Sequence, residues 1–156
     1  MFVVQRLSFP SPGEFYRRFK NDPEAARRAA FQLGQEMGQA LKQRYHVQGE
    51  GLQGLVELLY AFGKSIRAGV PGVDSGSSSV GIEGEKVVFR NSGFCAVMRA
   101  ALTLNIPWEW LDTNLAWPVL EGMASVIRPD IKMRVFSARC RGDAACTHIF
   151  EIREVK

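Results

Sequence analysis

The sequence contains few of the residues from which cofactor and metal sites are usually built. Its 156 residues include two histidines and three cysteines, and three cysteines in a chain of this length do not make a disulfide scaffold. A Gly-rich phosphate-binding loop, a dinucleotide-binding motif and a pair of carboxylates at catalytic spacing are all missing from the sequence. We therefore expect neither nucleotide-dependent chemistry nor glycosidase chemistry.

Long hydrophobic runs are also missing. No apolar stretch approaches the roughly 20 residues needed to cross a bilayer, and residues 1–6 do not show the basic stretch and apolar core of a secretory signal. Hydrophobic residues make up 46% of the chain and charged residues 23%, which is typical of a soluble globular protein. We expect a single cytoplasmic domain over residues 1–156 that does not bind a membrane.

The chain has no block of like charges. Its formal net charge is +4, but the arginines are scattered and are not interleaved with aromatic residues. The sequence also has no helix-turn-helix, zinc-finger or RNA-binding signature. We expect no nucleic-acid partner and interpret the basic residues as a solvated surface.

Helical and strand-like patterns alternate along the chain. Asp22 and Pro23 suit the N-cap and first turn of a long helix, in which Gly34 and Gly38 indicate close approach by another element. Pro118 should kink or divide the last helical region. The patterns predict an α+β fold of order α-α-β-β-α-α-β-β, with helices packed on a small antiparallel sheet. The predicted elements are a short helical segment at 11–19, helices at 22–47, 52–66, 92–102 and 108–127, a hairpin at 80–90, and a second hairpin with strands at 131–136 and 147–155.

The C-terminal hairpin carries two of the three cysteines. Cys140 and Cys146 flank Gly142-Asp143, which supplies the turn chemistry. Two neighbouring thiols in a hairpin can form a metal half-site, a disulfide or a reduced structural pair, and the sequence leaves these alternatives open. A tetrahedral zinc site needs four ligands, and the other nearby candidates are Cys95, Asp143, His148 and Glu151.

Several segments together resemble the 4-vinyl-reductase (hydrocarbon-binding) domain family, which is similar in fold to heme–nitric-oxide-binding sensor domains. They are the helix with Gly34 and Gly38, Glu57-Leu58-Leu59, Arg90-Asn91-Ser92, and the ending Cys140…Gly142-Asp143…Cys146…Phe150-Glu151-Ile152. The resemblance implies a small-molecule sensor or binding domain with an apolar pocket between helices and sheet. It also implies a zinc site in some members, formed by the hairpin cysteines, a glutamate three residues before the first of them, and a cysteine on the preceding helix.

This chain departs from that zinc pattern. Ser137 stands where the glutamate would be, and Leu115-Ala116-Trp117 stands where the helix cysteine would be. We therefore expect no cofactor and no complete zinc site at Cys140 and Cys146.

Aromatic and flexible apolar residues are numerous enough to line a ligand cavity. Small residues such as Gly34, Gly38, Gly122 and Ala124 should leave room for it. We expect a homodimeric binding or sensor domain without an output domain of its own, whose apolar or aromatic ligand contacts Met37, Phe62, Phe94, Met98, Trp117 and Phe136.

A second resemblance suggests an enzyme. Asn91-Ser92-Gly93-Phe94-Cys95, with the later Gly-Asp…Cys hairpin, resembles the L-2-amino-thiazoline-4-carboxylate hydrolase family, which implies a thiol-dependent hydrolase of a small cyclic substrate. Cys95 would be the nucleophile, activated at a helix N-terminus that lowers the pKa of a thiol, and His148 would be the base. The alternative is that Cys95 is a small buried hydrophobe and His148 a satisfied core side chain.

Overall fold

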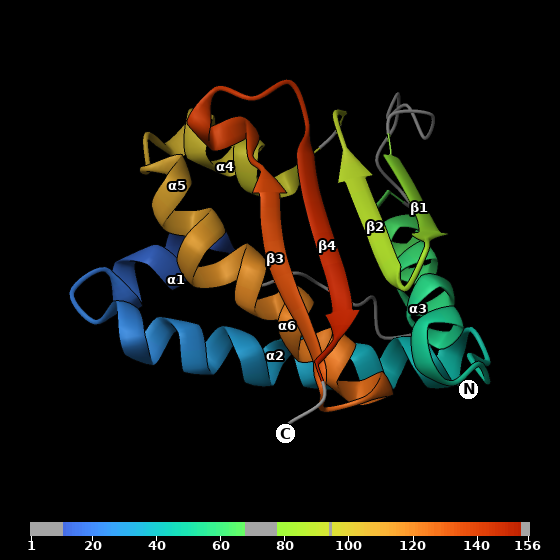
Figure 1. Ribbon diagram of the computed structural model, residues 1–156. Coiled ribbons are helices and arrows are strands. Elements are labelled where there is room, and N and C mark those ends of the chain that lie inside the picture. Colours follow the sequence, from blue (N-terminus) through green and yellow to red (C-terminus); the bar gives the residue numbers. More distant parts are fainter. Residues whose placement is uncertain (1–10, 68–77, 94, 154–156) are drawn as a thin grey trace.

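The chain folds as helices packed on one four-stranded antiparallel sheet, which confirms the predicted α+β class (Figure 1). This computed structural model describes residues 11–67, 78–93 and 95–153, so the predicted ligand contact Phe94 lies outside the described residues. The elements in chain order are α1 (Pro12–Phe19), α2 (Pro23–Arg44), α3 (Gly51–Arg67), β1 (Ser78–Glu83), β2 (Lys86–Asn91), α4 (Ala96–Leu104), α5 (Trp108–Leu111), the π-helical turn η2 (Asp112–Ala116), α6 (Trp117–Ile127), β3 (Ile131–Ser137), the 3-10 turn η3 (Arg139–Arg141) and β4 (Cys146–Ile152).

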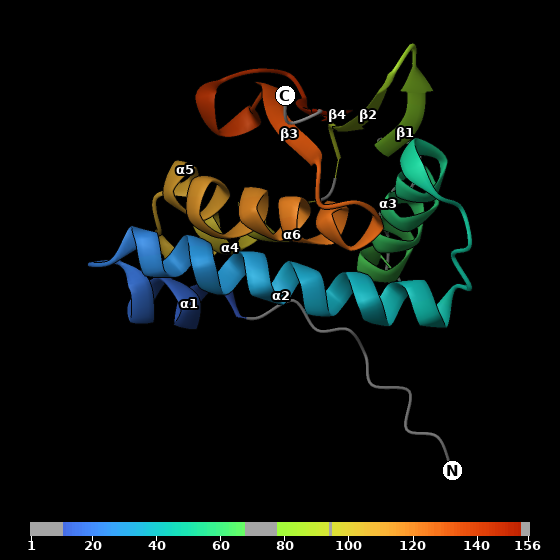
Figure 2. The same cartoon turned by 60° about the horizontal axis from the view of Figure 1, so that its bottom comes forward.

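The sheet has the strand order β1-β2-β4-β3, so the two hairpins lie side by side and β1 and β3 form the edges. Helices α2, α4 and α6 lie on one side of the sheet and α3 lies beneath β1 and β2 (Figure 2). No helix of the described residues covers the opposite face (Figure 2). The sheet therefore has an inner face toward the helices and an outer face away from them.

Side chains alternate between these two faces along each strand. Val87 and Phe150 are opposite one another in the register and are fully buried on the inner face. His148 and Phe89 form the next inner pair, and Ile131 pairs with Ile152 at the far end. These residues join the apolar faces of α2, α3 and α6 in one hydrophobic core.

The predicted glycines let α2 and α6 pack with their backbones in contact. A Cβ at Gly34 would overlap the carbonyl oxygen of Val119, and a Cβ at Gly122 would overlap the carbonyl oxygen of Phe31. The expected close approach by another element is therefore confirmed. The expectation that Gly34 and Gly122 leave room for a ligand is wrong, because the facing backbone occupies the space next to each of them.

The observed start of α4 differs from the predicted one. The N-cap of α4 is Cys95 rather than Asn91 or Ser92, and its Sγ accepts a hydrogen bond from Met98 N at 3.4 Å. Pro118 does divide the region 108–127, as predicted, and it lies in the first turn of α6. A proline has no N–H and its ring clashes with the carbonyl four residues earlier, which accounts for the wider π-helical turn at Asp112–Ala116 just before it.

None of the helices in the described ranges is both long enough and apolar enough to span a bilayer. The longest, α2, has only a narrow apolar stripe among charged residues.

Candidate functional site

The three cysteines come together at the end of the sheet where β2 and β3 finish and β4 begins. Cys95 caps α4, Cys140 lies in η3, and Cys146 is the first residue of β4, opposite Asn91. All three are free, half-buried thiols. Burial raises the pKa of both Cys95 and Cys140, and Asp112 and Cys146 add to both shifts, which places these groups near one another.

A buried carboxyl group belongs to the same cluster. Asp112, the first residue of η2, is only 4% exposed and shares a hydrogen bond with the Cys140 thiol. Burial raises the pKa of Asp112 to about 6, although the Cys140 hydrogen bond opposes the shift. We call Cys95, Asp112, Cys140 and Cys146 the thiol–carboxylate cluster.

The sequence analysis missed Asp112, although a signal was present. Asp112 lies next to Leu111 and three residues before Leu115, both fully buried, on the face of the helical region that packs into the core. A charged residue on a buried face is rare unless it is paired or functional. The buried carboxyl could have been identified from that pattern.

The thiols are held in their protonated form. Burial is the main cause of the raised pKa of Cys95, and the Met98 N–H only partly offsets it. Burial and Asp112 together raise the pKa of Cys140 to about 12, and burial also raises the pKa of Cys146. The expected activation of Cys95 by the helix N-terminus is therefore wrong, because loss of solvent outweighs the capping interaction.

His148 lies on the inner face of β4 and is only 6% exposed. Its ring stacks on Phe89 with centroids 6.0 Å apart. Burial lowers the pKa of His148 to about 4, and its Nδ1 has no hydrogen-bond partner within the described chain. Among the described residues, the hydrogen bond to the Cys95 sulfur comes from Met98 N, and none is found between Cys95 and His148.

The residues around the hairpin thiols are engaged in local structure. Ser137 Oγ donates to the carbonyl of Ala145 at 2.7 Å, and Asp143 Oδ2 accepts from Ala138 N at 2.8 Å. Cys146 Sγ accepts from Arg139 N at 3.3 Å.

Across residues 11–67, 78–93 and 95–153, no group of three or more His, Cys, Asp or Glu side chains is arranged to hold a metal ion.

The predicted ligand contacts are distributed over different environments. Met37 and Phe62 belong to the hydrophobic core, and Met98 and Trp117 are half-buried. The Arg141 guanidinium lies over the Trp117 ring, 5.1 Å from its centroid. Phe136 lies where the register of β3 with β4 shifts, and its side chain is 68% exposed in line with the other exposed positions of β3, so the structure does not bury it with the core residues Met37 and Phe62.

One groove lies away from all of these residues, between the end of α2 and the middle of α3. It encloses about 460 Å³ and is widely open to solvent. Its lining residues are Tyr45, His46, Val47, Gln48, Glu57, Tyr60, Ala61 and Lys64. None of the predicted ligand contacts lines it.

Comparison with protein-family models and with curated proteins finds no match for this chain. The family resemblance seen in the sequence therefore stays a prediction. The site combines protonated thiols, a carboxyl group with a pKa of about 6 and a neutral imidazole.

Proposed function

We propose that this protein is a small-molecule-binding domain whose ligand has an apolar body and one polar group. The observation that carries the proposal is a set of three buried polar atoms without a hydrogen-bond partner in the described residues: Trp108 Nε1, Asp112 Oδ2 and His148 Nδ1. Each such atom costs about 1–3 kcal/mol when buried and unsatisfied. They come from α5, η2 and β4: Trp108 precedes Asp112 by one helical turn, Asp112 shares a hydrogen bond with Cys140, and His148 lies two residues after Cys146 in β4.

A ligand with a hydroxyl or amide group would satisfy these atoms. The group could accept from Trp108 or donate to Asp112, and His148 could do either, depending on its tautomer. The surroundings are apolar, since Trp108 packs against the hydrophobic core and His148 stacks on Phe89. Ligand sites commonly combine an apolar lining with a few polar groups of this kind. The π-helical turn that carries Asp112 adds support, because such turns are frequent at functional sites.

The test compares small aromatic probes that differ only in the polar group. Benzyl alcohol and benzamide, but not toluene, can hydrogen-bond to the three atoms, so we expect both to bind more tightly than toluene in ligand-observed NMR and thermal-shift measurements. In Trp108→Phe this preference should weaken, because the indole N–H is lost together with part of the ring. Trp110→Phe is the matched control, since the Trp110 ring packs edge-on against Tyr16. Equal binding of toluene, or no binding of any probe, would contradict the proposal.

The alternative function is a thiol-dependent hydrolase with Cys95 as nucleophile and His148 as base. One observation favours it: Asp112, in the same cluster as Cys95, has a pKa of about 6, and such a carboxyl group can transfer protons near neutral pH. The raised pKa of Cys95 opposes it. Under this alternative, iodoacetamide near pH 6 should modify Cys95 faster than Cys140 or Cys146, whereas the binding function predicts almost no modification at that pH.

We also propose that the domain pairs with a second copy. Leu102 and Leu104 of α4 are apolar and mostly exposed, which suits a self-association surface. Sedimentation should then show a dimer that Leu102→Gln converts to monomer, and a monomer at high concentration would refute the pairing.

A further inference from the structure

The outer face of the sheet is basic and uncovered. Its outward-pointing positions and the residue that follows β4 carry five cations and two carboxylates, a net charge of +3 against +4 for the whole chain. No helix of the described residues lies over it (Figure 2). We call this surface the basic sheet face; its charged residues are Lys86, Arg90, Lys132, Arg134, Arg153, Glu83 and Glu151.

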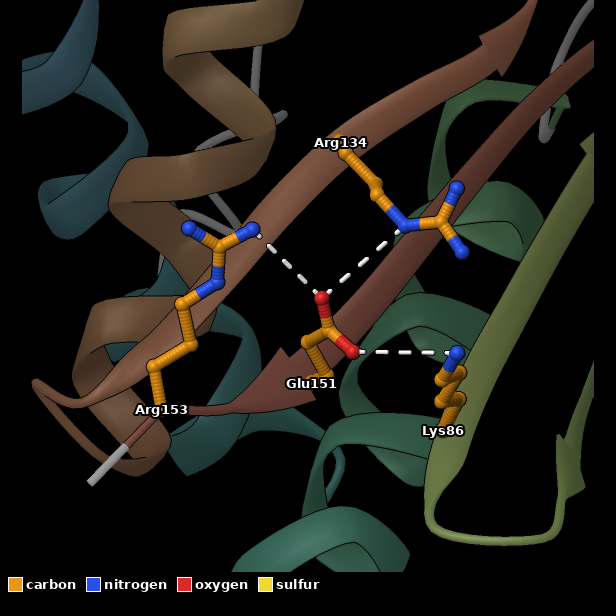
Figure 3. Close-up of polar contacts among 4 residues, drawn as sticks. All are labelled: Lys86, Arg134, Glu151 and Arg153. Atoms are coloured by element: carbon orange, nitrogen blue, oxygen red, sulfur yellow. Dashed lines mark ion pairs between the residues drawn. The ribbon is translucent and has the colours of Figure 1, made fainter.

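One carboxylate at the centre of this face is shared by three cations (Figure 3). Glu151 lies 3.8 Å from Lys86 Nζ, 3.9 Å from Arg134 Nε and 3.5 Å from the Arg153 guanidinium. The three cationic side chains are 43–62% exposed, whereas Glu151 is 25% exposed. Among the described residues, one carboxylate faces three cations, so Glu151 holds together cationic groups that have further N–H donors for another anion.

Apolar side chains lie among these charges. Ile149 pairs with Val88 on one side and with Arg134 on the other, in the middle of the face, but it is only 9% exposed, so neighbouring side chains already cover it. Phe136, near the end of β3, is 68% exposed. Exposed aromatic residues and arginines are both enriched in protein-binding surfaces.

We propose that the basic sheet face docks an acidic segment of a partner protein. Carboxylates of the segment pair with Lys86, Lys132 and Arg134, and an apolar side chain of the segment packs on Phe136. β3 is an edge strand, so an extended segment can also pair with its free backbone groups. This inference is independent of ligand binding on the inner side of the sheet.

Two other occupants fit the face less well. A second copy of the chain would bring two surfaces of net charge +3 together, which is unfavourable. Sheets that bind single-stranded nucleic acid usually stack two or three bases on aromatic side chains, and Phe136 is the only aromatic residue at an outward position of the described strands.

The test measures fluorescence anisotropy of a labelled peptide of alternating Glu and Val with the full-length protein. We expect salt-sensitive binding that weakens about tenfold in the triple variant Lys86→Gln, Lys132→Gln, Arg134→Gln. Phe136→Ser should also weaken binding, and because that side chain is exposed, the melting temperature should not change. A peptide of alternating Lys and Val should not bind.

A matched variant removes the same charges elsewhere: Lys20→Gln, Arg28→Gln and Lys64→Gln, all exposed on helices or their ends. It should bind the acidic peptide like the unmodified protein. Equal losses in the two triple variants, or no binding of the acidic peptide, would overturn the proposal. Tighter binding of oligo(dT) or of phosphatidylglycerol vesicles than of the peptide, lost in the first triple variant, would also overturn it and assign the face to nucleic acid or to a membrane surface.

Discussion

Asp112 and His148 should give the protein two opposite pH dependences that nearly cancel. The pKa of Asp112 rises from 3.8 to about 6 on folding, so the native state prefers the protonated carboxyl group. Stability from Asp112 is therefore full below pH 3.8 and is lost as the pH rises through 6. The pKa of His148 falls from 6.5 to about 4, so stability from the neutral imidazole is present above pH 6.5 and is lost as the pH falls through 4.

The magnitudes are similar because the shifts are similar. Each shift of about two pKa units corresponds to about 3 kcal/mol of unfolding free energy, and both side chains are almost fully buried, so solvent screening is small. Between pH 4 and pH 6, acidification stabilises the fold through Asp112 and destabilises it through His148. These two groups together should leave the unfolding free energy nearly flat over that interval.

Single substitutions should separate the two contributions. Asp112→Asn removes one titrating group with little change of shape, and this variant should lose about 3 kcal/mol between pH 6.5 and pH 4 relative to the unmodified protein. His148→Gln should show the opposite trend and gain stability on acidification. Urea unfolding monitored by circular dichroism at several pH values measures both slopes.

The decisive result is a change in how steeply the unfolding free energy depends on pH. A change in stability at a single pH would not test the assignment. If the slope of the Asp112→Asn variant matched that of the unmodified protein, the carboxyl group would have a normal pKa in the folded protein and would not be buried as described. If both variants changed the slope in the same direction, the assignment of opposite signs would be refuted.

The remaining predictions concern helix packing and the thiols. Gly122→Ala should destabilise the fold by about 2 kcal/mol, although alanine has the better helix propensity, because the new Cβ meets the backbone of α2. Gly81→Ala is the control and should be near neutral, because a Cβ there meets nothing within 4 Å. Equal melting temperatures for the two variants would contradict the close packing of α2 and α6. Purified protein should contain no stoichiometric zinc, and one equivalent of zinc in elemental analysis would contradict this. Cys146→Ala should lower the unfolding free energy by only about 1 kcal/mol, through lost packing. Reduction with dithiothreitol should leave the melting temperature unchanged, because Cys140 and Cys146 are free thiols; a lower melting temperature would indicate a disulfide.

The architecture could be predicted because local patterns and tertiary packing agree over most of the chain. Asp22 caps α2 as expected, accepting a hydrogen bond from Ala25 N, and Gly84 makes the turn of the first hairpin with a φ of +63°. Pro118 divides its helix. In each case the cause is the residue's own backbone chemistry, which acts within a few residues of itself.

The site could not be predicted in the same way, because its chemistry depends on burial by distant segments. The sequence places Cys95 at a helix start, where the local dipole favours the thiolate. In the structure, burial within the cluster that includes Asp112 and Cys146 removes Cys95 from solvent and raises its pKa instead. That reversal requires knowing that η2 and the start of β4 lie close to the start of α4, which no local pattern specifies.

Phe136 shows a different failure, in which the sequence carried the answer. Ile131, Met133 and Val135 alternate with Lys132, Arg134 and Phe136, so a period of two already places Phe136 on the charged side of β3. Assigning Phe136 to an internal ligand pocket gave more weight to its aromatic character than to its register. In the structure the alternation of exposed and less exposed side chains continues along β3 to Phe136, although the register with β4 shifts between Val135 and Ser137, and the ring is 68% exposed. An exposed position at residue 136 therefore follows from the alternation along its own strand, and a ligand contact inside the domain would have required the opposite phase.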